Sequence, residues 1–416
     1  MKQKAPGQRR AWQRRVLVLC WAAYAISYLC RTNLSIALPQ MTSELGWSAA
    51  KAGMIGSAFF VSYGAGHLLN GLLGDKLPIK RFMTLGLLGT SLCNLLMGVF
   101  PYYGVIFTVW LINGLFLSTL WGPIVRAVAV WYAPGERNLP AVIISISSLA
   151  GYLLSWAGLG LLLTFTGWRG AFFLPGVVTL LFTLWFWVRM NDSPQTVGME
   201  DFSQADAENL EAEAPKTSLT LWQLIRQERL LFFCVAAIAQ GVIKDGITLW
   251  EPTILTSLHD APSGLVSAAS ALVPVFSMLG VLLSGRLMNR YYGREKKPGI
   301  LLFLGTGGLC LVFFLLLGRS LWGDVLFFGA ISALLCGINT LLLTYIPLRL
   351  SVYGRSSGVA GMFNFCAYLG AGLSGILSGF LADISGWESS ILLWLVLCII
   401  GALAVAGGFP KKEKHA

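Results

Sequence analysis

The sequence predicts an all-α membrane protein with twelve transmembrane helices arranged as two six-helix bundles. Of its 416 residues, 56% are hydrophobic and only 12% are charged, whereas about a quarter of a soluble domain is charged. Apolar runs long enough to cross a hydrocarbon core of about 30 Å fill almost the whole chain. The two halves also repeat weakly. The short alternating segments typical of a membrane β-barrel do not occur in the sequence.

The distribution of basic residues sets the orientation. The first fifteen residues carry six basic residues and no acidic one, and the apolar run after them is too long for a secretory signal. We therefore expect an uncleaved first helix, cytoplasmic N- and C-termini and an inner (cell) membrane location. Most Lys and Arg residues fall in segments expected to be cytoplasmic. Lys51, Arg169 and Arg319 fall on the outer side instead, and Arg31, Arg126 and Lys244 fall within helices. The expected helices span residues 16–38, 51–74, 82–101, 104–130, 140–165, 168–188, 230–257, 262–285, 299–318, 322–347, 357–382 and 388–409.

One long polar stretch separates the two sets of helices. It is rich in acidic residues followed by basic ones, which is typical of a flexible linker. We divide the chain into an N-terminal bundle (1–189), a cytoplasmic linker (190–229) and a C-terminal bundle (230–416).

The halves repeat in parallel. Arg31 and Lys244 are each followed by a proline eight residues later, and Gly167-Trp168 corresponds to Gly386-Trp387. Such duplications fold as two bundles around a central site, with alternating access by rocking.

Two cations lie near the middle of predicted helices, Arg31 in the first and Lys244 in the seventh. A charge in mid-membrane is costly and usually has a function or a partner. The repeat makes the two positions equivalent, so we expect them to face one another across the central cavity. An anionic substrate, a phosphate above all, explains such a pair. The alternative is neutralisation within the protein, for which Asp245 and Glu251 are the nearby acids.

Other polar and aromatic residues follow helical spacing that would line a cavity. Tyr24, Tyr28 and Arg31 share one helix face, as do Tyr63 and His67, and Asn364 and Tyr368. The run Trp121-Gly-Pro123 is expected to bend helix 4, and Arg126 to snorkel or to bind a gate partner. Each tyrosine, and His67, has packing as its alternative role.

The sequence shows no nucleophile triad, metal cluster, phosphate-cradling loop or cofactor motif, so we expect neither an enzyme nor a cofactor. The eight cysteines lack metal-type spacing and are expected to pack in helices. The expected partners are a small anion and the bilayer, not nucleic acid, with the protein a monomer.

Several motifs carry a family resemblance. The segment Gly71-Leu-Leu-Gly-Asp75-Lys-Leu-Pro-Ile-Lys-Arg81 resembles the signature loop of the major facilitator superfamily. The segments Tyr28-Leu-Cys-Arg-Thr-Asn33, Ile243-Lys-Asp-Gly-Ile and Trp250-Glu-Pro-Thr253 resemble motifs of the organophosphate:phosphate antiporter family. The resemblance covers most of the chain and implies the major facilitator fold and exchange of a sugar or glycerol phosphate for inorganic phosphate.

This resemblance also implies roles for individual residues. Arg31 and Lys244 would clamp the phosphate, while Asp75, Arg126, Asp245 and Glu251 are candidates for coupling or gating. By the resemblance the pocket would be lined by Tyr24, Tyr28, Tyr63, His67 and Ser148. Helical spacing adds Asn364 and Tyr368, and the bend in helix 4 adds Trp121. The sequence departs from the family at His67, usually lysine, at Leu342-Leu343, usually Gly-Pro, and at the added acid Glu251.

Two alternatives remain open. Proton-coupled anion symporters share the pattern Arg-x-Asn-Leu-Ser-x-Ala, but they carry an Asp where this chain has Cys30. A non-transporting sugar-phosphate sensor is the other, and it would need a partner surface that the sequence does not reveal.

Overall fold

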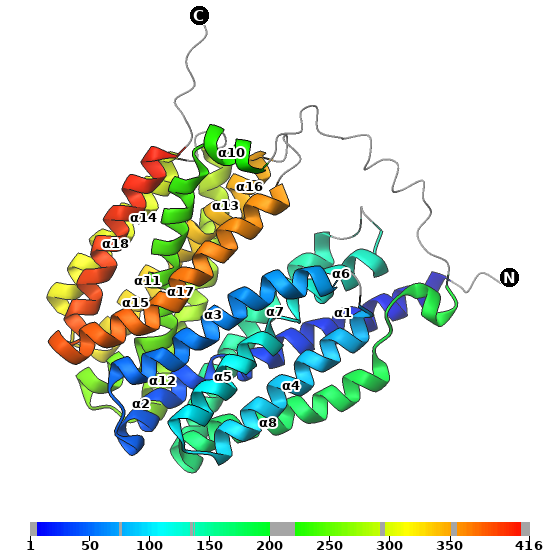
Figure 1. Ribbon diagram of the computed structural model, residues 1–416, viewed down its shortest axis with the longest axis horizontal. Coiled ribbons are helices and arrows are strands. Elements are labelled where there is room, and N and C mark those ends of the chain that lie inside the picture. Colours follow the sequence, from blue (N-terminus) through cyan, green and yellow to red (C-terminus); the bar gives the residue numbers. More distant parts are fainter. Residues whose placement is uncertain are drawn as a thin grey trace, which may run out of the picture. The chain divides into compact units, whose positions relative to one another are not determined.

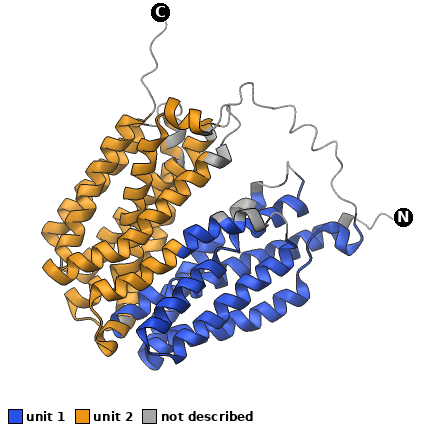
Figure 2. Ribbon diagram, viewed as in Figure 1, with its two compact units in different colours: residues 1–40, 62–214 blue, residues 41–61, 215–416 orange. Residues whose placement is uncertain are grey.

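The computed structural model describes residues 6–74, 77–133, 136, 138–199, 221–291, 296–350 and 356–408. In these ranges the chain is helical and contains no strand (Figure 1). The chain forms two compact units, residues 1–40 with 62–214 and residues 41–61 with 215–416 (Figure 2). The division at 189 and 230 expected from the linker stays a prediction.

The first unit is built from the helices of the N-terminal half. Several expected helices are interrupted, so that helix 1 becomes α1 and α2, and helix 4 becomes α5 and α6. The elements are α1 (Pro6–Leu29), α2 (Asn33–Leu45), α3 (Ala49–Gly74), α4 (Ile79–Val99), α5 (Tyr103–Leu117), α6 (Trp121–Trp131), α7 (Asn138–Leu153), the π-helix η2 (Leu154–Leu159), α8 (Gly160–Arg189) and η3 (Pro194–Val197). The end of α2, from residue 41, and the first half of α3, up to residue 61, belong to the second unit.

The second unit contains the C-terminal helices. Its longest members, α11 and α17, pack against each other, and α11 also packs against α15 and α18. The elements are α10 (Leu221–Gln227), α11 (Leu230–His259), α12 (Ser263–Ser270), α13 (Leu272–Arg290), α14 (Lys296–Leu316), α15 (Leu321–Thr340), the π-helix η4 (Leu341–Tyr345), α16 (Ile346–Arg349), α17 (Ser356–Ser385) and α18 (Trp387–Gly407).

The helices agree with the expected membrane spans. Ten segments in the described ranges are long and apolar enough to cross a membrane, and one of them, Ile146–Arg189, has 44 residues. That segment is two helices joined at Gly167, whose backbone is not helical. With α3, which has 26 residues, these segments account for the twelve helices expected from the sequence. The all-α membrane fold is confirmed.

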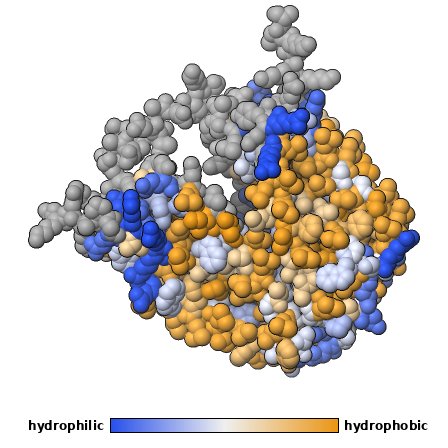
Figure 3. Space-filling model, turned by 180° about the vertical axis from the view of Figure 1, so that it is seen from behind, coloured by the Kyte–Doolittle hydropathy of each residue, from blue (hydrophilic) through white to orange (hydrophobic). Residues whose placement is uncertain are grey.

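Apolar side chains cover the outer surface of the helices. Leu181, Leu184 and Val188 of α8 project outward and are largely exposed, as is Leu403 of α18. Figure 3 shows apolar residues over most of the visible face. Because lipid, unlike water, makes such exposure favourable, the chain is a multi-pass membrane protein.

Two glycines at corresponding positions of the repeat have the same backbone conformation. Gly167 has φ 66° and ψ −177°, and Gly386 has φ 79° and ψ 174°. Each is followed by a tryptophan that begins a helix, Trp168 or Trp387. A positive φ is costly for any residue with a Cβ, so glycine is needed at both turns.

Within the second unit, the start of α3 packs against α17 through backbone contact. A Cβ added at Gly53 would overlap the carbonyl oxygen of Gly375, and one at Gly379 would lie 2.5 Å from the carbonyl oxygen of Ala49. Close approach of small residues is how membrane helices associate where no hydrophobic effect drives them. The Asp383 carboxylate accepts hydrogen bonds from the N–H groups of Ala49 and Ala50, both at 2.8 Å. An anion at a helix N-terminus satisfies free amides and the helix dipole.

Candidate functional site

The first membrane helix is broken where it carries Arg31. Helix α1 ends at Leu29 and α2 begins at Asn33. The N–H groups of Arg31 and Thr32 both bond the Tyr28 carbonyl, at 3.1 and 3.0 Å, which makes a tight turn. Non-helical backbone at membrane depth is tolerated only where protein or a cavity surrounds it. Broken helices of this kind form ion and substrate sites in transporters.

Buried polar side chains from other helices of the first unit hold this break. Asn113 of α5 donates to the Cys30 carbonyl at 3.0 Å and accepts a hydrogen bond from Thr90 of α4. Thr32 donates to Ser155 of η2 at 2.7 Å. The Cys30 carbonyl therefore has a tertiary partner, and the Thr32 side chain next to Arg31 is bonded to another element of the unit.

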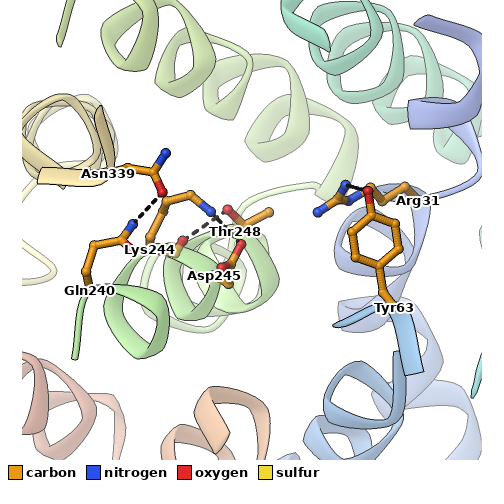
Figure 4. Close-up of polar contacts among 7 residues, drawn as sticks. All are labelled: Arg31, Tyr63, Gln240, Lys244, Asp245, Thr248 and Asn339. Atoms are coloured by element: carbon orange, nitrogen blue, oxygen red, sulfur yellow. Dashed lines mark hydrogen bonds and ion pairs between the residues drawn. The ribbon is translucent and has the colours of Figure 1, made fainter. Parts of the chain in front are cut away.

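Arg31 lies among tyrosines. Its Nη1 donates to the Tyr63 hydroxyl at 3.1 Å. Its guanidinium carbon lies 4.5 Å from the centre of the Tyr63 ring and 5.4 Å from that of Tyr28. Figure 4 shows the guanidinium against the Tyr63 hydroxyl. Tyrosine faces attract a cation without neutralising it, so the guanidinium keeps its positive charge.

Further aromatic side chains extend this cluster. Tyr24 contacts Tyr28 edge-on at 5.4 Å and Trp121 at 5.0 Å between ring centres. His67 packs edge-on against Tyr63 at 4.5 Å. The structure therefore brings together six of the expected residues, from α1, α3, α6 and the turn after α1, through contacts within one unit.

Lys244 lies on α11 in the second unit and has an acidic neighbour. Its Nζ forms an ion pair with Asp245 at 2.8 Å, and its carbonyl accepts a hydrogen bond from Thr248 at 3.1 Å. One turn earlier, Gln240 lies within 3.4 Å of Asn339 of α15 (Figure 4). The alternative of a partner within the protein therefore applies to Lys244, and that partner is Asp245. The lysine side chain keeps 30% of its surface exposed while Asp245 keeps 4%, so the ammonium can still receive an anion.

The other expected residues have different outcomes. Ser148 lies half-buried on α7, Asn364 is exposed on α17, and Tyr368 is half-buried one turn later. Their contact with substrate stays a prediction. Arg126 donates to the Leu77 carbonyl at 2.8 Å, which ties α6 to the signature loop. Asp75 lies outside the described residues.

Sequence reasoning missed several residues of the cluster. Tyr152 of α7 packs on Tyr28 with 4.8 Å between ring centres. It adjoins Gly151, where an added Cβ would lie 2.7 Å from the Tyr28 Cβ. A glycine at this position is the sequence signal that could have indicated the close approach of α7 to α1. Asn113 was not expected as a site residue, because its role depends on the break in another helix.

Comparisons with known proteins agree with this architecture. The family model described as Major Facilitator Superfamily matches residues 20–367. A bacterial homologue of the human lysosomal transporter Spinster has the same fold, with a TM-score of 0.78 at 15% identity, over 95% of this chain and 96% of that one. The fold and the family match define a membrane transporter, not an enzyme.

The chain belongs to the Major Facilitator Superfamily. It is 27% identical to a probable hexose phosphate transport protein of Chlamydia muridarum, covering 95% of this chain and 91% of the relative. It is 23% identical to the glycerol-3-phosphate transporter of Bacillus subtilis, covering 96% and 93%. It is also 22% identical to the membrane sensor protein UhpC of Escherichia coli, covering 97% and 93%. The resemblance noted in the sequence is thereby confirmed.

Proposed function

We propose that this protein exchanges a small organophosphate, a sugar or glycerol phosphate, for inorganic phosphate across the inner membrane by alternating access. The observation that carries the proposal is Arg31, held in a helix break by a buried polar network and lined by Tyr28 and Tyr63. Relatives named for hexose phosphate and glycerol 3-phosphate give the substrate class. The orientation, with both termini cytoplasmic, follows from the distribution of basic residues.

In this proposal Arg31 binds phosphate oxygens with two parallel N–H donors, and Lys244 supplies a second cation. The Tyr63 hydroxyl, which accepts from Arg31, can donate its own proton to a phosphate oxygen. The remaining pocket residues are Tyr24, Tyr28, His67, Trp121, Ser148, Asn364 and Tyr368.

Asp245 has a coupling role in this mechanism. It holds Lys244 at 2.8 Å, so an arriving phosphate competes with it for the ammonium. Phosphate binding replaces Asp245 as the anionic partner of Lys244. The Asp245 carboxylate then needs another partner. Arg126, bonded to the Leu77 carbonyl, would act with Asp75 at the signature loop as a gate.

The test is exchange in proteoliposomes. Purified protein is reconstituted with internal phosphate, and uptake of radiolabelled phosphate is measured with and without external glycerol 3-phosphate or glucose 6-phosphate. We expect uptake that needs internal phosphate and is inhibited by at least one organophosphate. Absence of phosphate exchange by well-folded protein would refute the proposal.

Matched variants make the test specific. Arg31→Ala and Lys244→Ala should each abolish exchange. Arg169→Ala removes an arginine that is also stacked on an aromatic ring, 4.4 Å from Trp168, but is exposed. Lys51→Ala removes an exposed lysine. Both controls should exchange phosphate like the wild type.

Two other functions predict different results. A proton-coupled symporter would accumulate the anion from liposomes that hold no phosphate, driven by a pH gradient. A sensor is the second candidate because UhpC is among the relatives. A sensor would bind an organophosphate in detergent, with loss of binding in Arg31→Ala, and yet show no exchange.

A further inference from the structure

One acid in the second unit is completely buried. Glu251 lies on α11 next to Pro252 and has 0% of its surface exposed. Neither carboxylate oxygen has a hydrogen-bond partner among the described residues. Lys244 lies seven residues earlier, which is about 10 Å along a helix axis. Its ammonium is engaged with Asp245 instead.

One neighbour of Glu251, Ser270, comes from the short helix α12, which packs against α11. Ser267 and Ser270 lie one turn apart on α12, both buried, and their hydroxyls also lack hydrogen-bond partners among the described residues. The Ser270 hydroxyl lies close enough to the Glu251 carboxyl to interact with it, although outside hydrogen-bond geometry. The sequence of α12 contains no ionisable residue.

The charged groups of the other elements around α11 are engaged elsewhere or exposed. Asp324 of α15 bonds His259 at 2.8 Å. Asp383 of α17 bonds the N-terminus of α3, and Glu388 of α18 is exposed. The remaining charged residues are Arg226 of α10, which stacks on Trp222 at 5.1 Å, the exposed Asp260 that ends α11, and the exposed Lys51 of α3. Among the described residues, no ion pair of Glu251 with a cation occurs.

A carboxylate in such a place would be among the costliest arrangements in a protein, because it loses water and gains neither a cation nor a donor. A protonated carboxyl avoids most of that cost. It also gains an O–H donor, for which the Ser270 hydroxyl is a suitable acceptor.

We propose that Glu251, with Ser270 beside it, is a proton-binding site that makes transport respond to the pH gradient. In the conformation described here the carboxyl holds one proton taken from water. In a conformation that admits water to Glu251, the O–H bond breaks and the proton leaves to that side. The coupling rests on the proposed function, whereas the presence of the proton does not.

The proton can be detected without any substrate. Infrared spectra of the purified protein at neutral pH are compared between wild type and Glu251→Gln. We expect the wild type alone to show the C=O stretching band of a protonated carboxyl, with a shift to lower frequency in D₂O. Glu388→Gln, which changes an exposed glutamate in the same unit, should leave that band intact. A difference spectrum for Glu251→Gln without this band overturns the proposal.

The coupling is measured as a ratio in proteoliposomes, namely the rate of phosphate exchange with a pH gradient divided by the rate without one. We expect the ratio to differ from one by severalfold in the wild type and in Glu388→Gln, and to fall to one in Glu251→Gln. A wild-type ratio of one, an unchanged ratio in Glu251→Gln, or loss of all exchange in a folded Glu251→Gln overturns the coupling. If the protein shows the carboxyl band but exchanges no phosphate, the proposed function is refuted and the proton-binding site is not.

Discussion

The contact between α3 and α17 gives the sharpest test of the packing. In Gly375→Ala the new Cβ would lie 2.6 Å from the Ser57 Oγ and closer still to the carbonyl oxygen of Gly53. Ordinary contact begins at 3.4 Å, so the hydroxyl alone would have to move by about 0.8 Å, the difference of the two distances. The Gly53 carbonyl is backbone and cannot rotate away, so the two helices must separate.

The cost follows from that separation. A gap of roughly 0.5–1 Å loses a quarter to a half of each van der Waals contact, and overpacking of this kind costs about 1–3 kcal/mol. This corresponds to about a 5- to 150-fold change in the equilibrium between the packed helices and an opened state. The N–H groups of Ala49 and Ala50, which bond Asp383, report that opening.

Hydrogen–deuterium exchange of purified protein measures the effect. We expect the amides of Ala49 and Ala50 to exchange about 5 to 150 times faster in Gly375→Ala than in the wild type. Gly361→Ala is the matched control, since Gly361 lies on the same helix with nothing within 4 Å of its Cβ position. Both variants gain the same helix propensity, about 1 kcal/mol. Equal exchange rates in the two variants would refute the argument.

Three smaller changes test other contacts. Tyr63→Phe removes a hydroxyl that accepts from Arg31 and would donate to phosphate, but it keeps the ring. A hydrogen bond to a charged group contributes about 1.5–3 kcal/mol, so phosphate affinity measured by radioligand binding should fall about 10- to 150-fold, and an unchanged affinity would contradict this. Asn113→Leu leaves the Cys30 carbonyl without its hydrogen bond, at a cost of about 1–3 kcal/mol. The thermal unfolding temperature should therefore fall by several degrees. An unchanged temperature would show that the network does not hold the break. Asp383→Asn removes an anion from a helix N-terminus at a cost of about 1 kcal/mol, so local amide exchange should rise about fivefold, and no rise would mean that the charge contributes nothing.

The sequence predicted the helical architecture well because its signals are local. Length and apolar composition decide whether a segment can span a membrane, and α11 begins at Leu230 and ends at His259, close to the expected 230–257. Gly167 and Gly386 marked equivalent turns because a positive φ favours glycine. The proline of Trp121-Gly-Pro123 likewise marked the place where α6 begins.

The details of the site depend on tertiary partners and were only partly predictable. The spacing of Tyr24, Tyr28 and Arg31 placed them on one face, and the structure confirms their contacts. The break at Cys30–Thr32 was not predicted, because its hydrogen bonds come from Asn113 and Ser155 on other elements. The sequence left an ion pair of Lys244 with Asp245 as an open alternative. It could not decide the question, because adjacent residues of a helix do not normally face each other.

The break after α1 also has a consequence for the order in which the protein is assembled. The span from Gln8 to Leu45 has the lowest mean hydropathy of the ten candidate spans in the described ranges, and it contains Arg31, which costs about 2.5–3.5 kcal/mol at the centre of a lone inserted helix. It leaves the ribosome before the other helices described here, yet its polar partners lie on those later elements, with Asn94 on α4, Asn113 on α5 and Ser155 on η2. A nascent chain that ends before α4 therefore has a first segment with an open turn and a charge in lipid. We expect this segment to stay beside the insertion machinery until the following helices emerge, so that the unit enters the bilayer as a group of helices rather than one at a time.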